Sequence, residues 1–118
     1  MSSIYKVLTE EEWKHATSLG YVTTELDKKD GFIHLSTSKQ LALTLYLYFK
    51  NYEKVILLEI NQDSIKDEIV FEEAELSGRL GKFPHLYGKL SIQNVKKDWI
   101  LKRNGFDLPK KVLEESEE

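Results

Sequence analysis

The sequence predicts an α+β fold: a single small domain in which two main helices pack on a mixed, mostly antiparallel sheet. Two helical patterns lie among several short apolar segments of strand type, and 118 residues leave room for one core. Hydrophobic residues form 41% of the chain and charged residues 31%, proportions usual for a globular domain. We expect residues 1–109 to form the domain and residues 110–118, which end in EESEE, to form an acidic, disordered tail.

The first strand and the first helix have clear local signals. Residues 4–8 (IYKVL) have the alternation of a strand. Thr9 followed by Glu12 forms a capping box, a usual helix start, and Gly20 is a usual helix stop. We therefore expect a strand that leads directly into a helix ending at Gly20.

A second strand and helix are expected between residues 32 and 51. Residues 32–36 have strand-type composition and follow an Asp-Gly turn signal. The hydroxyls of residues 36–38 offer several N-caps for a helix that runs to about Asn51. This helix is apolar nearly all round, apart from a stripe formed by Gln40, Thr44 and Asn51. We expect the rest of its circumference to be buried as the central helix of the core.

The second half of the chain predicts mainly strands. Residues 55–60 (VILLEI) form a continuous apolar run, which is typical of a strand covered on both faces. Further strands are expected at residues 69–72, 91–95 and 99–102. Residues 77–84 (SGRLGKFP) contain two glycines and a proline and are expected to form a loop.

Composition restricts the compartment and the partners. The absence of cysteine excludes a disulfide framework, a thiolate metal site and a cysteine nucleophile. Residues 1–13 lack the features of a signal peptide, and the apolar stretch at residues 41–49 is too short to span a membrane. The net charge of −3 makes a nucleic-acid partner unfavourable. We expect a cytoplasmic protein with no membrane partner.

His34 is the first candidate site residue. In a strand its side chain shares a face with Phe32 and Ser36, whereas His15 faces away from the apolar side of the first helix. Ser36, Thr37 and Ser38 would lie beside the free N–H groups of the second helix, a geometry suited to an anion. The alternatives are a core histidine hydrogen-bonded to the backbone and ordinary helix capping.

His85 is the second candidate, in a proline-held segment expected to be a rigid loop with Tyr87 close by. Arg79 and Lys82 upstream would donate to a phosphate or carboxylate. The alternatives are a packed loop and solvated surface cations.

Glu72 is the acidic candidate, since it ends a strand-like run. A carboxylate there, near His34 and His85, would serve as an acid or base or bind a ribose hydroxyl. An acidic surface turn is the alternative. The two histidines lack the spacing of metal ligands, so no metal site is expected.

Five segments together resemble, in chain order, DUF952, a family of small bacterial proteins of unknown function. They are IYKVL, GFIHLST (residues 31–37), VILLEI, VFEEA and FPHLYG (residues 83–88), and the resemblance covers about residues 4–95. That family has been grouped by fold with ADP-ribosyltransferases. Its HLS element is similar to a strand motif of RNA 2′-phosphotransferases, which use NAD to remove a phosphate. The resemblance implies an ADP-ribosyltransferase-like fold and NAD as the cofactor.

The same resemblance implies roles for residues. His34 would contact the nicotinamide–ribose end of the dinucleotide, with Ser36 or Thr37 beside it. Lys6 stands where such transferases place a histidine or arginine on their first core strand. The full set of expected site residues consists of His34, His85 and Glu72 as catalytic residues and Lys6, Ser36, Thr37, Arg79 and Tyr87 as ligand-binding residues.

Two functions remain open. The first is an NAD-dependent transferase or nucleotide-processing enzyme with a pocket formed by GFIHLST and FPHLYG. The second is a non-catalytic module that binds a small molecule or a protein partner through the same surface.

Overall fold

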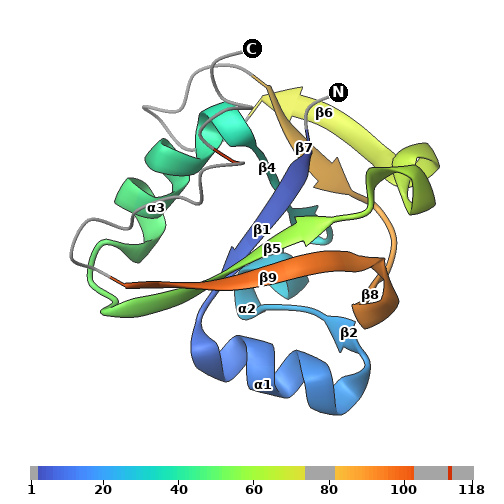
Figure 1. Cartoon of the computed structure of the whole chain (residues 1–118). Coiled ribbons are helices and arrows are strands. Elements are labelled where there is room, and N and C mark those ends of the chain that lie inside the picture. The colour runs from blue at the N-terminus through green and yellow to red at the C-terminus, as the bar shows by residue number, and fades with distance from the viewer. Residues whose placement is uncertain (1–2, 74–81, 103–111, 113–118) are drawn as a thin grey trace.

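A computed structural model of the chain describes residues 3–73, 82–102 and 112. Its centre is a four-stranded sheet of order β4-β1-β5-β9 (Figure 1). The strands of this sheet are β1 (Ile4–Leu8), β4 (Ser36–Thr37), β5 (Lys54–Ile60) and β9 (Val95–Lys102). Each pairing in it is antiparallel.

Two smaller sheets complete the architecture. A three-stranded sheet has the order β3-β7-β6 and a two-stranded sheet pairs β2 with β8, again antiparallel throughout. Their strands are β2 (Tyr21–Val22), β3 (Ile33–His34), β6 (Ile69–Glu73), β7 (Lys82–Leu86) and β8 (Leu90–Ser91). The helices are α1 (Glu10–Leu19), α2 (Glu25–Asp30) and α3 (Leu41–Phe49), with short 3-10 turns at Ser38–Gln40, Gln62–Ser64, Lys66–Glu68 and Ile92–Asn94. The predicted α+β class is confirmed.

The central sheet has a hydrophobic core on each face because the alternate side chains of β1 and β5 point in opposite directions. Ile4, Leu8 and Leu58 lie in the core shared with α1 and the three-stranded sheet. Tyr5 and Leu57 lie in the core shared with α3. Figure 1 shows α1 and α3 on opposite sides of this sheet. The expectation that residues 55–60 form a strand covered on both faces is confirmed, since all six are buried.

The first helix begins and ends as predicted. The Thr9 side chain accepts from the backbone N–H of Glu12, the Glu12 carboxylate accepts from the N–H of Thr9, and Gly20 closes the helix with a φ of +91°. His15 is exposed on this helix, as expected. The capping box therefore sets where the chain leaves β1.

The strand expected at residues 32–36 is divided between two sheets. β3 pairs with β7 in the three-stranded sheet, whereas β4 pairs with β1 in the central sheet. Leu35 lies between them, is 2% exposed, and donates its N–H to the carbonyl of Pro84. This crossing places His34 where the two sheets meet.

The loop expected at residues 77–84 is corrected at its end, because Lys82, Phe83 and Pro84 belong to β7. The Pro84 carbonyl accepts the N–H of Leu35, one residue beyond the last β3 pair at His34 and His85. Proline has no N–H to return this bond, so Pro84 lies where the pairing of β7 with β3 ends. His85 accordingly lies in a strand and not in a rigid loop.

The strand expected at residues 91–95 is also wrong for most of its length. The Ser91 side chain accepts from the N–H of Gln93, and the Asn94 side chain accepts from the N–H of Ser91. These local bonds favour a 3-10 turn at Ile92–Asn94. The separate strand expected at residues 99–102 is the end of the longer β9, which begins at Val95.

Within the polar stripe expected along the second helix, Thr44 faces the interior, whereas Gln40 is partly exposed and Asn51 is exposed. Thr44 is 8% exposed and its hydroxyl is hydrogen-bonded to the Ser36 hydroxyl at 2.9 Å. Tyr46, expected to be buried, is 63% exposed, and Asn51 lies beyond the helix end at Phe49. The hydrogen bond to Ser36 supplies a polar partner inside, so the helix turns Thr44 inward.

One tail residue lies in the core. Val112 is fully buried against the α3 face, although residues 110–118 were expected to be a disordered tail. The other residues of that tail lie outside the described part of the chain, as does Arg79. None of the described helices is long and apolar enough to cross a membrane.

Candidate functional site

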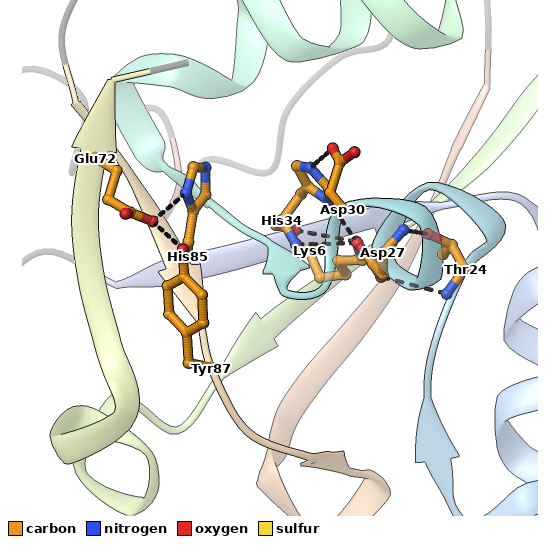
Figure 2. Close-up of polar contacts among 8 residues, drawn as sticks. All are labelled: Lys6, Thr24, Asp27, Asp30, His34, Glu72, His85 and Tyr87. Atoms are coloured by element: carbon orange, nitrogen blue, oxygen red, sulfur yellow. Dashed lines mark hydrogen bonds and ion pairs between the residues drawn. The ribbon is translucent and has the colours of Figure 1, made fainter. Parts of the chain in front are cut away.

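A buried ion pair joins the first strand to a short helix that the sequence reading did not anticipate. Lys6 in β1 is 4% exposed, and its Nζ lies 3.1 Å and 3.0 Å from the two carboxylate oxygens of Asp27 in α2. The third N–H of the ammonium is directed at the carbonyl oxygen of His34, 3.0 Å away. Figure 2 shows Lys6 beneath His34 and Asp27. All three ammonium N–H groups therefore have acceptors.

Local sequence explains the position of Asp27. Thr24 caps α2, and Asp27 completes a capping box in which each residue accepts the backbone N–H of the other. Gly31 ends the helix with a φ of +82°, a conformation that glycine adopts at little cost. Thr24, Asp27 and Gly31 were thus available signals for this helix.

His34 lies between two carboxylates. Its Nδ1 is 2.7 Å from Oδ1 of Asp27, and its Nε2 is 2.9 Å from Oδ2 of Asp30. Asp27 Oδ1 also accepts the backbone N–H of His34 at 3.0 Å. An ionised carboxylate only accepts hydrogen bonds, so the ring donates to both carboxylates when each nitrogen carries a proton.

The Asp27 carboxyl is held in its ionised form. Burial alone raises the pKa of this group, but the charge of Lys6 and the hydrogen bonds from His34 and Lys6 outweigh burial and hold the pKa well below its usual range. A carboxylate in this state keeps His34 Nδ1 as a donor. Asp27 therefore fixes both the place and the orientation of the imidazole.

A cavity of about 230 Å³ opens beside this network. β4 pairs only with Ile4 and Tyr5 of β1, so residues 6–8 of β1 have no strand partner on that side in the described part of the chain. Lys6, Val7 and Thr9 line the cavity along this strand edge, and His34 and Ser36 line it from the crossing segment.

The opposite wall of the cavity comes from the second half of α3 and the turn after it. Thr44, Tyr48, Phe49 and Tyr52 line it, with the rings of Phe49 and Tyr52 5.9 Å apart. The cavity therefore combines an unpaired strand edge, hydroxyl groups and aromatic rings. It lies along α3 and not at the start of that helix, where the hydroxyl cluster was expected to hold an anion.

A second polar cluster lies on the three-stranded sheet, at the left of Figure 2. Glu72 Oε1 is 2.9 Å from His85 Nδ1 and accepts the hydroxyl of Tyr87 at 2.7 Å. The hydrogen bonds from Tyr87 and from His85 lower the pKa of Glu72, and the bond to Glu72 raises the pKa of Tyr87. Glu72 thus stays ionised and Tyr87 protonated around the imidazole.

The two clusters meet at their histidines. His34 and His85 are paired directly across β3 and β7, with ring centroids 5.7 Å apart. Phe32 stacks on His85 at 4.1 Å and contacts the His34 ring at 4.7 Å. The predicted proximity of Glu72 to His85, and of His85 to His34, is therefore present.

The expected pocket formed by both motifs is corrected by this geometry. The cavity is lined by residues of GFIHLST, whereas Glu72, His85 and Tyr87 do not line it. Lys82 also lies away from the cavity, at a strand end where its carbonyl accepts from Gln40. The residues missed in the sequence are Asp27, Asp30 and the aromatic wall. Lys6 is 21 positions from Asp27, but His34 is only seven positions from Asp27 and four from Asp30, so the two aspartates also had a local signal.

A family model described as "Protein of unknown function (DUF952)" matches residues 7–98. The chain belongs to the DUF952 family. The resemblance carried by GFIHLST and FPHLYG, which both lie within the matched residues, is thereby confirmed at the level of the family.

This DUF952 chain is similar to solved structures of a protein from the bacterium Caulobacter crescentus. The crystal structure of Protein CC0527 from Caulobacter crescentus has 28% identity and a TM-score of 0.79, with 97% of this chain and 98% of that chain covered. A solution NMR structure of CC0527 has 29% identity and a TM-score of 0.72, with 92% and 91% covered. No curated protein matches the sequence.

Proposed function

We propose that the protein binds a nucleoside-sized ligand, the base-and-sugar part of a nucleotide or of an NAD-like molecule, in the cavity beside β1. The observation that carries this proposal is an unpaired strand edge facing aromatic side chains across one hollow. A strand edge offers N–H and C=O groups to a base edge or a carboxamide, and aromatic rings stack on a planar ring. Hydroxyl side chains such as Thr44 suit a sugar.

Size and charge narrow the class of ligand. The cavity of about 230 Å³ is smaller than the roughly 300–1,000 Å³ usual for sites that enclose a drug-sized molecule. The Lys6 ammonium is already bonded to Asp27, so it offers no free charge to a phosphate. Both facts favour a nucleoside part without phosphate groups inside the cavity, with any phosphate at the edge of the cavity.

The resemblance of the family to ADP-ribosyltransferases supports the same class. In that comparison His34 lies at the nicotinamide–ribose end of a dinucleotide, and here His34 and Ser36 line the cavity. NAD is accordingly the first ligand to test.

The test measures thermal stability and heat of binding with adenosine, nicotinamide riboside, ADP-ribose and NAD. A ligand at 100 times its Kd stabilises the folded state by about 2.7 kcal/mol. Leu26 lines the cavity from α2 and is 41% exposed, so Leu26→Trp fills the cavity with little effect on the core. We expect this variant to lose binding.

Leu19→Trp is the matched control, because Leu19 is a helix residue that is 43% exposed and does not line the cavity. It should bind as the wild type does. The proposal fails if no member of the panel stabilises the wild type, or if Leu26→Trp binds equally well.

Acid–base catalysis is a second candidate function, favoured by the Glu72–His85 pair. The carboxylate holds Nδ1, and Nε2 has no hydrogen-bond partner in the described part of the chain. Phe32 stacked at 4.1 Å fixes the ring plane. An imidazole held in this way can take or give a proton at Nε2, whereas both nitrogens of His34 are occupied.

The distinguishing experiment follows hydrolysis of NAD, in which the bond between nicotinamide and ribose breaks, water bonds to the ribose carbon, and nicotinamide leaves. If the chain is an enzyme, His85→Gln should lower the rate about 10²- to 10⁴-fold while leaving binding nearly unchanged. Binding of NAD without release of nicotinamide would instead identify a non-catalytic module.

A further inference from the structure

We propose that Nε2 of His34 is the binding position for an anionic group of the ligand, its phosphate, and that Asp30 holds this position until the phosphate replaces it. The inference rests on the proposed function, since it names where the charged part of a nucleotide lies when the nucleoside part fills the cavity.

Asp27 alone is sufficient to hold the imidazole. It accepts from the ring Nδ1 at 2.7 Å and from the backbone N–H of His34 at 3.0 Å, and its side chain is 1% exposed. The ring position is therefore set without Asp30. The second carboxylate is an additional acceptor on an imidazole that is already in place.

Asp30 differs from Asp27 in exposure and in anchoring. It is the last residue of α2, just before the glycine that ends the helix, and 34% of its side chain is exposed. Within the described part of the chain, its carboxylate has one hydrogen bond, to His34 Nε2. Rotation of this side chain into solvent would free the N–H without moving the backbone, and an exposed pair of this kind is weak.

Among the described residues that line the cavity, no free ammonium or guanidinium group is available to an anion. Lys6, Glu12 and His34 are the lining residues with an acidic or basic side chain. The three N–H groups of Lys6 are taken by Asp27 and the His34 carbonyl, and Glu12 repels an anion. His34 Nε2–H is therefore the donor that a phosphate can reach by displacing an exposed side chain.

The Asp30 carboxylate occupies the position at His34 Nε2 that a phosphate would take, and it has similar acceptor oxygens. A carboxylate and a phosphate both present oxyanion acceptors to an N–H donor, and a phosphate has more such oxygens. A phosphate on a sugar bound in the cavity also reaches His34 within the same molecule, which raises its effective concentration there.

The experiment compares nucleosides with their monophosphates by titration calorimetry: adenosine with AMP, and nicotinamide riboside with nicotinamide mononucleotide. Asp30→Asn should bind the monophosphates about three- to tenfold tighter than the wild type, because the competing carboxylate is gone. Its affinity for the nucleosides should stay within twofold of the wild type.

Glu25→Gln controls for the loss of a negative charge, since Glu25 lies on the same helix, is 94% exposed and does not contact His34. It should leave all affinities within twofold. In the His34→Gln variant, each monophosphate should bind no more tightly than the corresponding nucleoside. An NMR signal of the wild-type His34 Nε2–H that shifts with AMP but not with adenosine reports the same contact without any substitution.

The outcomes separate the two proposals. Two results would overturn only this inference while the nucleosides still bind. In the first, Asp30→Asn leaves the affinity for the monophosphates unchanged; in the second, it raises the affinity for a nucleoside as much as for its monophosphate. Failure of every nucleoside and nucleotide to bind would overturn the proposed function together with it.

Discussion

Lys6 and Asp27 form an ion pair that is almost entirely shielded from water, with side chains 5% and 1% exposed. Removing two charges from water costs several kcal/mol per ion, so the pair as a whole need not stabilise the fold. Its role is positional: Asp27 also accepts from the ring and backbone of His34. The buried pair therefore sets the orientation of the His34 imidazole at the cavity.

Loss of one partner of this pair should be costly, because the other charge is left buried. Lys6→Met or Asp27→Asn should lower the free energy of unfolding by about 3–5 kcal/mol at pH 7, measured by urea denaturation. The double variant should lose less than the sum of the single losses. Additive losses would show that the two side chains do not interact.

The stability that Asp27 contributes should decrease as the pH falls, because its pKa is lower in the folded state than in the unfolded state. Because the pKa of Asp27 is depressed in the folded state, its contribution is complete above the ordinary aspartate pKa of about 3.9 and is lost as the pH falls below that value. The difference in unfolding free energy between the wild type and Asp27→Asn should therefore shrink between about pH 5 and pH 2. A constant difference would contradict the assigned ion pair.

Short secondary-structure elements set the geometry of the site. α2 has six residues, yet its capping box at Thr24 and its glycine stop place Asp27 and Asp30 on either side of one imidazole. The crossing at Leu35 then transfers the chain from one sheet to the other. A helix this short depends on its two ends, since propensity alone would not hold it.

Gly31 tests this dependence. A Cβ there would meet nothing within 4 Å, so the cost of Gly31→Ala comes from the φ of +82° alone and should be about 1–2 kcal/mol in chemical denaturation. Gly31→Asn should cost less, because asparagine adopts this conformation more readily. Equal stability of the alanine variant and the wild type would show that the helix end relaxes.

The whole molecule is built around a four-stranded sheet with a hydrophobic core on each face, and the site lies at one open edge of its strand β1. Ile56, Leu58 and Ile60 of β5 fill the core toward α1, and Val55 and Leu57 fill the core toward α3. The cavity lies where β4 stops covering β1. The packed centre therefore provides a rigid wall for a site that is otherwise built from short segments.

Packing in this centre should dominate stability. Leu58→Ala, at a position with 0% exposure, should lower the free energy of unfolding by about 2–5 kcal/mol. Ile100→Ala on the neighbouring strand β9 removes an apolar side chain that is 61% exposed and should change it by no more than about 0.5 kcal/mol. Similar losses in both variants would contradict the assigned core.

Local patterns in the sequence determined the elements whose signals lie within a few residues. The capping box of Thr9 with Glu12 and the apolar run at residues 55–60 predicted α1 and β5, and GFIHLST with FPHLYG indicated the DUF952 family. The same kind of signal marks α2, where Thr24 and Asp27 form a capping box. Each of these features depends on neighbours along the chain, which a single sequence displays.

Tertiary structure alone decided how these elements meet. Lys6 finds Asp27 across 21 positions, Thr44 turns inward because Ser36 offers a hydroxyl, and the strand at residues 32–36 divides between two sheets. Only this pairing showed that His34 lines the cavity while His85 faces Glu72 beside it. The reason is physical: partners for buried polar groups and strand edges come from segments distant in sequence, and no local period encodes which segment arrives.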